Sequence, residues 1–265
     1  MKFLSILAIV KNEEDYIKEF VRFYRINGVE HFYLYDNESI TPLEETLRDF
    51  ADICTITRIT GRKKQVTAYN HFVKKFARET EWVAVFDVDE FVLTKQHATL
   101  RDFVRDTGHN RDCISINWVV FGNGPHIRKP AKGLLIENYL YSEGRQHKNV
   151  KSVVRTRAIR AFKHPHFPEL KWFRKHVNAA GNPMSGAENR EETTHIIQLN
   201  HYFTKSMEEY EVKLRSPRAD TGEIRLENSR DMEWMRGEPE RCSVHYDDTL
   251  WKKFSRQLEE NNYTL

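Results

Sequence analysis

The sequence has few cysteines and no long apolar run. Three of its 265 residues are cysteine, at positions 54, 113 and 242, and they form no C-x-x-C pair. Their odd number and wide spacing argue against a disulfide framework and against a zinc site. No apolar stretch approaches the ~20 residues that a membrane-spanning helix needs. A reducing compartment is the simplest interpretation, so we expect a cytoplasmic protein.

A strong excess of one charge is also lacking. The chain has 42 Lys and Arg against 39 Asp and Glu, a formal net charge of +3. An excess this mild does not indicate a polyanionic partner, so we expect no nucleic acid to bind. A basic surface could still touch a membrane, which leaves a peripheral membrane contact open. The sequence does not fix the oligomeric state.

The first ninety residues alternate apolar runs of strand length with stretches of helical periodicity. Residues 1–10 look superficially like a signal peptide, but no small-residue cleavage site follows, so we expect a first buried strand. Asn12 is the expected cap of a helix that ends at Gly28. Further strands are expected at 31–35, 53–58 and 82–86, and further helices at 42–50 and 65–79. This alternation predicts a parallel sheet with right-handed crossovers.

The second half of the sequence is less regular. We expect a helix at 100–105, strands at 113–118 and 193–200, and a last helix at 248–260. Ser206 and Glu209 form a capping-box pattern that opens a helix through about Leu214. Residues 133–190 indicate mixed strand and loop. With no internal repeat and no low-complexity linker, the chain is expected to be one α/β domain, 1–265.

An acidic motif follows the apolar run that begins at Trp82. Asp87 and Asp89 are spaced i, i+2, and Glu90 comes next. The carboxyl ends of parallel strands face the ligand crevice, which would place these carboxylates where substrates bind. Carboxylates crowded at one strand end favour a cation, either Mg²⁺ or Mn²⁺, bound together with a diphosphate. The alternative is that they are solvated loop residues.

Polar side chains follow the other expected strands as well. Lys11 and Glu13 come after the first strand, Asp36 after the second and Arg62 after the third. A nucleotide lying across these strand ends would find carboxylates for its base or ribose and a cation for its phosphates. Each residue alone is more often part of a turn or a cap than of a binding site. Together they favour a nucleotide site.

Several segments, in the same order along most of the chain, carry a resemblance to a known family. They are Ile9–Glu14, Tyr16–Phe20, Gly28–Ser39, Gln65–Asn70, Trp82–Phe91, Trp118–Gly122, Lys151–Arg155 and Leu199–Phe203 with Lys205 and Ser206. At these residues the chain resembles glycosyltransferases of the GT-A type, in particular the family 2-like group and the related family 92, also called domain of unknown function 23. The resemblance implies a GT-A-like, Rossmann-like fold: a mostly parallel sheet flanked by helices, with an elaborated C-terminal half.

The resemblance also implies roles for individual residues. Asp36 would contact the nucleoside, Asp87 the ribose or the metal, and Asp89 the metal. His201 would reach the metal or the diphosphate, and an imidazole ligand favours Mn²⁺ over Mg²⁺. The positions assigned to the donor site are Lys11, Glu13, Asp36, Arg62, Asn70, Asp87, Lys151 and Lys205. Residues 1–93 would be the nucleotide-binding half, and residues 94–265 the acceptor side with the C-terminal helices.

The sequence departs from the family pattern after Ser39, where Ile40 and Thr41 replace an acidic residue. The catalytic base is also open: Asp220, Glu188 and His166 are candidates. Asp220 is favoured because it lies in a glycine-containing loop that could close over the donor. A retaining transfer would need no such base.

We therefore expect a metal-dependent, hexosyltransferase-like glycosyltransferase in polysaccharide biosynthesis, with Asp89 and Asp220 as its catalytic residues. It would move a sugar from a nucleotide-sugar donor, with a UDP-sugar favoured, to a glycan or glycolipid acceptor. One alternative is a sugar-phosphate nucleotidyltransferase, but such enzymes carry a glycine-rich loop after the first strand and residues 11–14 contain no glycine. Another is a non-catalytic carbohydrate-binding protein, which predicts loss of the acidic motif.

Overall fold

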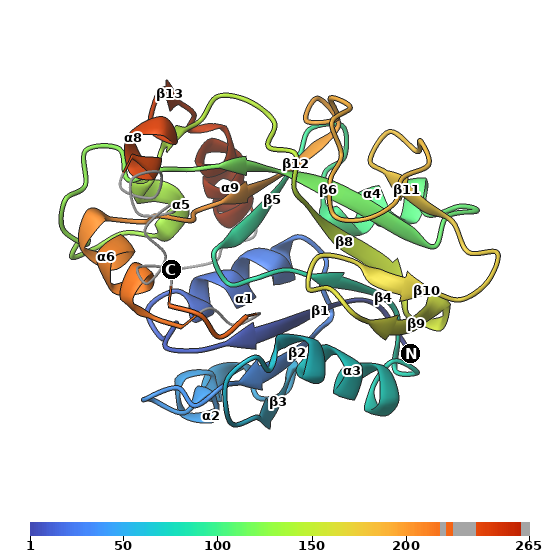
Figure 1. Cartoon of the computed structure of the whole chain (residues 1–265). Coiled ribbons are helices and arrows are strands. Elements are labelled where there is room, and N and C mark those ends of the chain that lie inside the picture. The colour runs from blue at the N-terminus through green and yellow to red at the C-terminus, as the bar shows by residue number, and fades with distance from the viewer. Residues whose placement is uncertain (218–220, 225–236, 261–265) are drawn as a thin grey trace.

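A single large β-sheet runs through the protein (Figure 1). The computed structural model describes residues 1–217, 221–224 and 237–260. The strands of the sheet are β1 (Lys2–Val10), β2 (His31–Asp36), β3 (Cys54–Arg58), β4 (Thr80–Val85), β5 (Glu90–Thr94), β6 (Cys113–Val120), β8 (Val150–Arg155), β11 (His176–Asn178) and β12 (Ile197–His201). Across the described residues their order is β3-β2-β1-β4-β8-β6-β12-β5, and β11 pairs with β6.

Helices flank this sheet, and two small sheets lie beside it. The helices are α1 (Ile17–Ile26), α2 (Leu43–Thr46), α3 (Gln65–Lys75), α4 (Leu100–Thr107), α5 (Leu135–Asn138), α6 (Met207–Arg215), α8 (Glu238–Arg241) and α9 (Thr249–Glu260), with 3₁₀ turns η1 (Arg48–Phe50) and η2 (Thr156–Ala158). The small sheets pair β9 (Ile159–Phe162) with β10 (Pro168–Leu170), and β7 (Tyr141–Ser142) with β13 (His245–Tyr246). None of the described helices combines the length and apolar character that crossing a membrane requires.

The strand directions confirm the predicted fold class. Strands β3, β2, β1 and β4 are parallel to one another, as the alternation of strands and helices predicts. Strand β8 then lies antiparallel between β4 and β6, and β5 is antiparallel to β12. The sheet is therefore mostly parallel, with its reversals in the elaborated second half. This is the GT-A-like arrangement that the resemblance implies.

Both faces of the sheet are buried. Along β1, Leu4 and Ile6 belong to the cluster that contains α1, whereas Leu7 belongs to the cluster that contains α3. Successive side chains of a strand point to opposite faces, so one strand supplies two cores. This explains why the first strands read as continuous apolar runs.

Some expected boundaries were wrong for identifiable reasons. Asn12 does not cap α1: it has a φ of 53°, and its side-chain oxygen accepts a hydrogen bond from the Ile40 amide at 2.9 Å. Helix α3 ends at Lys75 rather than Glu79, because the chain turns there into β4 at Thr80. The expected helix at 42–50 is divided into α2 and η1, and β12 begins at residue 197 rather than 193.

Other local expectations are confirmed. Gly28 follows α1 with a φ of 84°, a left-handed conformation that favours glycine. The Ser206 side chain accepts from the Glu209 amide, and the Glu209 side chain accepts from the Ser206 amide, which completes the capping box of α6.

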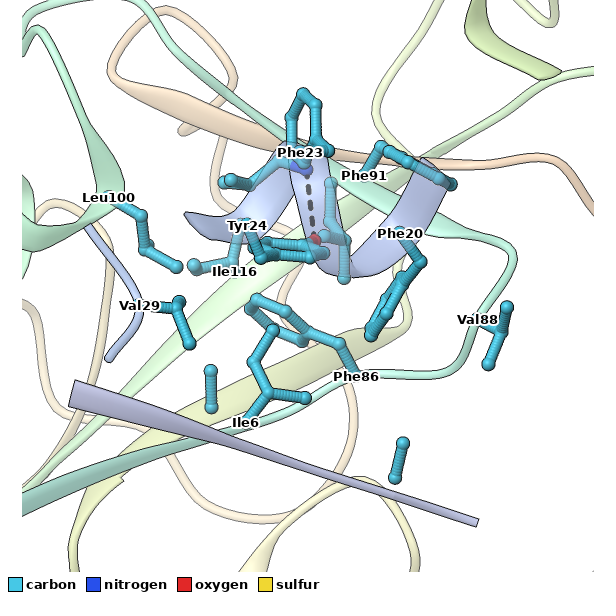
Figure 2. Packing of buried hydrophobic residues seen from close by; sticks show 14 of the residues in the cluster. Ile6, Phe20, Phe23, Tyr24, Val29, Phe86, Val88, Phe91, Leu100 and Ile116 are labelled. Carbon is cyan, nitrogen blue, oxygen red and sulfur yellow. Dashed lines mark hydrogen bonds between the residues drawn. The ribbon is translucent and has the colours of Figure 1, made fainter. Parts of the chain in front are cut away.

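An aromatic cluster fixes α1 against the chain that follows the acidic motif. Figure 2 shows Phe20, Phe23 and Tyr24 of α1 with Phe91 of β5 in this packing. The Tyr24 hydroxyl donates to the Glu90 carbonyl at 2.8 Å and accepts from the Val92 amide at 3.2 Å. Since Tyr24 is fully buried, these bonds replace water at two backbone groups of β5. Tyr24 thereby holds the start of β5 in register beside Asp89.

We expect Tyr24→Phe to lower the free energy of unfolding by about 1–3 kcal/mol, because it leaves two buried backbone groups of β5 without a partner. Urea denaturation at equilibrium measures the change. Tyr246→Phe is the matched control, since Tyr246 is 53% exposed and should change stability by less than about 0.5 kcal/mol. Equal effects of the two substitutions would contradict the structural role given to Tyr24.

Candidate active site

The acidic motif lies in the turn between β4 and β5. Six mostly buried residues of β4 bring the chain to the carboxyl end of the parallel strands, where Asp87 and Asp89 leave the sheet. The Glu90 side chain folds back to accept from the Asp87 amide at 2.8 Å, and the Glu90 amide donates to the Asp87 carbonyl at 3.0 Å. The turn is thus fixed by its own residues, and Asp89 is only 8% exposed.

Asp89 lies beside one imidazole and one ammonium group. The Nε2 atom of His201, the last residue of β12, is 3.6 Å from Asp89 Oδ1. The Nζ atom of Lys213 on α6 donates to Asp89 Oδ2 at 2.9 Å and to the Phe203 carbonyl at 2.8 Å. Although burial acts to raise the pKa of Asp89, Lys213 and His201 hold this pKa well below its usual value. Asp89 is therefore a carboxylate.

Asp87 lies beside a different lysine. Lys151 on β8 is fully buried, and its Nζ donates to Asp87 Oδ2 at 2.7 Å and lies 3.5 Å from Glu90. The Gln65 amide donates to the other Asp87 oxygen at 3.3 Å. Burial acts to lower the pKa of Lys151, but the carboxylates of Asp87 and Glu90 raise it above its usual value. Burial raises the pKa of Glu90 itself well above its usual value.

A third lysine lies beside the chain that follows β1. Lys205 Nζ is 2.7 Å from Glu13 and 4.1 Å from the centre of the Tyr16 ring. Lys205 has a φ of 54°, an unusual conformation for a non-glycine residue. Burial raises the pKa of Glu13 against the opposing effect of Lys205. Three buried or half-buried lysines thus accompany the carboxylates at this end of the sheet.

Buried polar atoms without partners lie next to Asp89. The Trp118 ring centre is 4.4 Å from that of His201 and 5.0 Å from that of His166. Within the described part of the chain, Trp118 Nε1, His166 Nδ1 and His201 Nδ1 have no hydrogen-bond partner. Burial lowers the pKa of His201 and lowers that of His166 to about 2, so both imidazoles are neutral near pH 7. These three side chains form what we call the Trp118 patch.

The residues around Asp89 fit a divalent cation that also binds a ligand. Asp89 and His201 offer one oxygen and one nitrogen donor, a set that Mn²⁺ accepts. Among the residues that the structure describes, no three acidic, histidine or cysteine side chains form a group able to hold a metal alone. Asp87 is therefore not brought to Asp89 and His201 as a third ligand. An ion here would take its remaining ligands from water or from the oxygens of a diphosphate.

Two residues assigned to the donor site from the sequence bond to backbone groups. Asp36 is fully buried, and its oxygens accept from the Ser39 amide at 2.9 Å and the Leu43 amide at 3.5 Å. Asn70 donates to the Phe162 carbonyl and accepts from the Phe162 amide, both at 2.8 Å. These contacts shape the loop after β2 and join α3 to β9.

The remaining predicted residues lie at the edge of the site or beyond the described residues. Lys11 and Arg62 are exposed, after β1 and after β3. Glu188 is exposed and its carboxylate lies 2.7 Å from Lys148.

Asp220 lies outside the described residues. Gly222, two residues on, packs closely against the side chain of Lys63.

Lys213 was not found from the sequence. Its helix was expected, and Tyr210 and Leu214 mark the buried face of that helix. Lys213 is three residues after Tyr210, so helical spacing alone places it near that face. The signal in the sequence was a lysine between two buried positions of an amphipathic helix. Its carboxylate partner, Asp89, lies 124 residues earlier, and no local pattern connects the two residues.

Comparison with known proteins identifies the family. The model of glycosyltransferase family 92 matches residues 5–261. A family 92 protein of Ricinus communis is 26% identical over 139 residues, which are 50% of this chain and 25% of that protein. A family 92 protein of Oryza sativa subsp. japonica is 26% identical over 106 residues, 39% of this chain and 18% of that protein. The chain thus spans about a quarter or less of the length of these curated relatives.

Likeness to solved structures is weak. TarS 1-349 of S. aureus in complex with UDP is 14% identical, with a TM-score of 0.37 over 59% of this chain and 47% of that chain. UDP-glucose pyrophosphorylase complexed with UDP-glucose is 11% identical, with a TM-score of 0.30 over the whole of both chains. The family match extends over nearly the whole sequence, and on that ground the chain belongs to glycosyltransferase family 92.

Proposed function

We propose that the protein transfers a sugar from a nucleotide-diphosphate sugar, favouring a UDP-sugar, to a hydroxyl of a glycan or glycolipid acceptor. The observation that carries this proposal is the Asp89–His201 pair, 3.6 Å apart at the carboxyl end of the sheet and accompanied by three lysines. Family 92 membership supports the reaction class. In the reaction, the bond between the anomeric carbon and the diphosphate oxygen breaks, and a bond to the acceptor oxygen forms.

We propose that Asp89 and His201 hold Mn²⁺ or Mg²⁺ jointly with the donor. The ion would supply positive charge to the departing diphosphate. In the protein alone, Lys205 is paired with Glu13 and Lys213 with Asp89. Their ammonium groups would donate to diphosphate oxygens, where negative charge develops. Lys151 would keep Asp87 oriented through its hydrogen bond to Oδ2.

We assign the sugar itself to the Trp118 patch. The indole Nε1 can only donate a hydrogen bond, whereas a neutral imidazole nitrogen can donate or accept. Hydroxyl groups match such a set because each one both donates and accepts. The patch is next to Asp89, so a sugar bound there would have its diphosphate beside the proposed metal ligands.

An inverting transfer needs a group that takes the acceptor's proton, and we propose Asp220 for that role. Gly222, two residues further along, lies close to the side chains of Lys63 and Arg62. Glu188 is a poorer base, because its hydrogen bond to Lys148 lowers its pKa.

The first prediction from the proposed function concerns the donor and the metal. UDP should bind more tightly with Mn²⁺ than without it, and Asp89→Asn should weaken binding in Mn²⁺ by at least about 100-fold, since a metal ligand is lost. Isothermal titration calorimetry with a panel of nucleoside diphosphates measures both effects. Asp106→Asn is the control, because its side chain is 56% exposed on α4. Equal affinity with and without Mn²⁺ would remove the metal from the proposal, and binding of no nucleotide would remove the donor site.

The second prediction concerns Lys213. Its ammonium group competes with a cation for Asp89 Oδ2, so Lys213→Met should tighten Mn²⁺ binding in the absence of nucleotide by roughly tenfold. The variant also leaves Asp89 buried without its ammonium partner, so its melting temperature should fall and Mn²⁺ should restore it. Electron paramagnetic resonance of free Mn²⁺ and thermal denaturation measure these effects. Lys252→Met removes an ion pair of the same length with Asp248 on the surface. It should change neither the Mn²⁺ affinity nor the melting temperature. Unchanged Mn²⁺ affinity in Lys213→Met would refute the competition.

The third prediction concerns the base. Asp220→Asn should lower the rate of UDP release from a UDP-sugar, in the presence of an acceptor panel, by about 10²–10⁴-fold. UDP affinity should stay within about threefold, because the base contacts the acceptor and not the diphosphate. Glu188→Gln removes an exposed carboxylate and should leave the rate within about twofold. A larger loss in Glu188→Gln than in Asp220→Asn would reverse the assignment.

A further inference from the structure

The loop between β10 and β11 presents two neighbouring aromatic side chains to solvent. Trp172 is 81% exposed and Phe173 is 98% exposed. Phe173 has a φ of 61°, a conformation that L side chains rarely adopt, and its ring centre is 6.4 Å from that of Trp172. In Figure 1 this loop lies at the right-hand edge, on the side where N marks the first residue. The core does not need these rings, since they are outside it.

Basic side chains surround the two rings. The loop itself reads Lys171-Trp172-Phe173-Arg174-Lys175, five exposed residues that we call the 171–175 tip. Lys171 Nζ donates to the Arg157 carbonyl at 2.8 Å, which ties the tip to the β9–β10 hairpin. That hairpin and the turn before it add three further exposed basic residues, Arg157, Arg160 and Lys163.

Acidic residues offset only part of this charge. Glu169 pairs with both Arg160 and Lys163, at 3.1 and 3.0 Å, and Asp112 pairs with Arg174 at 3.2 Å. Six basic side chains therefore face two carboxylates in this region. The surface is aromatic at its tip and positively charged around it, although the chain as a whole carries a formal net charge of only +3.

We propose that the 171–175 tip and the adjacent hairpin dock on the surface of an anionic phospholipid membrane. Tryptophan and phenylalanine enter the headgroup region, where an aromatic ring leaves water without losing polar contacts. Lysine and arginine side chains around them are attracted to anionic headgroups. Neither contribution alone gives stable docking, and the tip combines both.

The 171–175 tip lies at the opposite end of the sheet from Asp89. The Cys113 amide, at the start of β6, donates to the Lys175 carbonyl at 3.0 Å, which places the tip at the amino end of β6. Strands β4 and β6 are both antiparallel to β8 and therefore run in the same direction. The acidic motif follows the carboxyl end of β4. Membrane docking would thus leave the proposed donor site accessible, and the two proposals can fail independently.

Co-sedimentation of the full chain with vesicles tests the proposal. We expect binding to vesicles of phosphatidylcholine mixed with phosphatidylglycerol, weak binding to phosphatidylcholine alone, and weakening as salt is added. Lys171→Gln/Lys175→Gln should weaken binding roughly 30-fold, from the attraction of two basic residues near the surface. Trp172→Ser/Phe173→Ser should weaken it by at least about tenfold and abolish a blue shift of tryptophan emission on vesicle addition.

Matched controls separate the tip from general surface properties. Lys74→Gln/Lys75→Gln removes two exposed lysines from α3, and Ile127→Ser/Val244→Ser removes two side chains that are each 71% exposed. Both should bind vesicles within about twofold of the unchanged protein. Equal losses in tip and control variants, or no binding to anionic vesicles, would overturn the proposal. The proposal would also be overturned if the protein formed a concentration-dependent dimer that the tip substitutions dissociate. In that case the tip would bind a second copy of the chain and not a membrane. Circular dichroism checks that each variant folds.

Discussion

Burying lysine ammonium groups against carboxylates is the constraint on which this site depends. Moving an ion from water into a protein costs several kcal/mol even after relaxation, and a close partner of opposite charge must offset that cost. Lys151 is fully buried, and it has Asp87 at 2.7 Å and Glu90 at 3.5 Å. Strand β8 can supply this lysine because it lies directly beside β4. The antiparallel strand β8 thus supplies the lysine that pairs with the acidic motif.

The three lysines come from three elements, and this distribution matters for the proposed reaction. Lys151 is on β8, Lys205 follows β12, and Lys213 is on α6. Lys151 is enclosed by the sheet, whereas Lys205 lies just before the Ser206 cap and Lys213 lies in the helix that this cap begins. A lysine held by a single carboxylate can exchange that partner for a phosphate oxygen without a net change of charge pairing. Lys151 does not meet this condition, because it contacts two carboxylates and its side chain is only 1% exposed. The side chains of Lys205 and Lys213 are 10% and 28% exposed, so a ligand can reach them more readily.

Local patterns in the sequence predicted the parallel strands, the capping box and the acidic motif, because each is a matter of neighbouring residues. They did not predict what long-range contacts decide. Asn12 looked like a helix cap, but a backbone amide from the loop after β2 uses its side chain. Asp36 is predicted to contact the nucleoside, and what the sequence did not show is that its oxygens also bond to amides of its own loop. Lys213 could not be assigned, since its partner is remote in the chain.

The polar atoms of the Trp118 patch favour a ligand that carries hydroxyl groups. A buried donor or acceptor without a partner costs about 1–3 kcal/mol, so native proteins leave few of them. Trp118 Nε1 and His201 Nδ1 are both such atoms, and their rings are in contact. A hydroxyl brings one donor and two acceptor sites, which can match these atoms at little desolvation cost. The polarity of the patch is therefore consistent with the sugar of the proposed nucleotide-sugar donor, and the nearby lysines are consistent with its diphosphate.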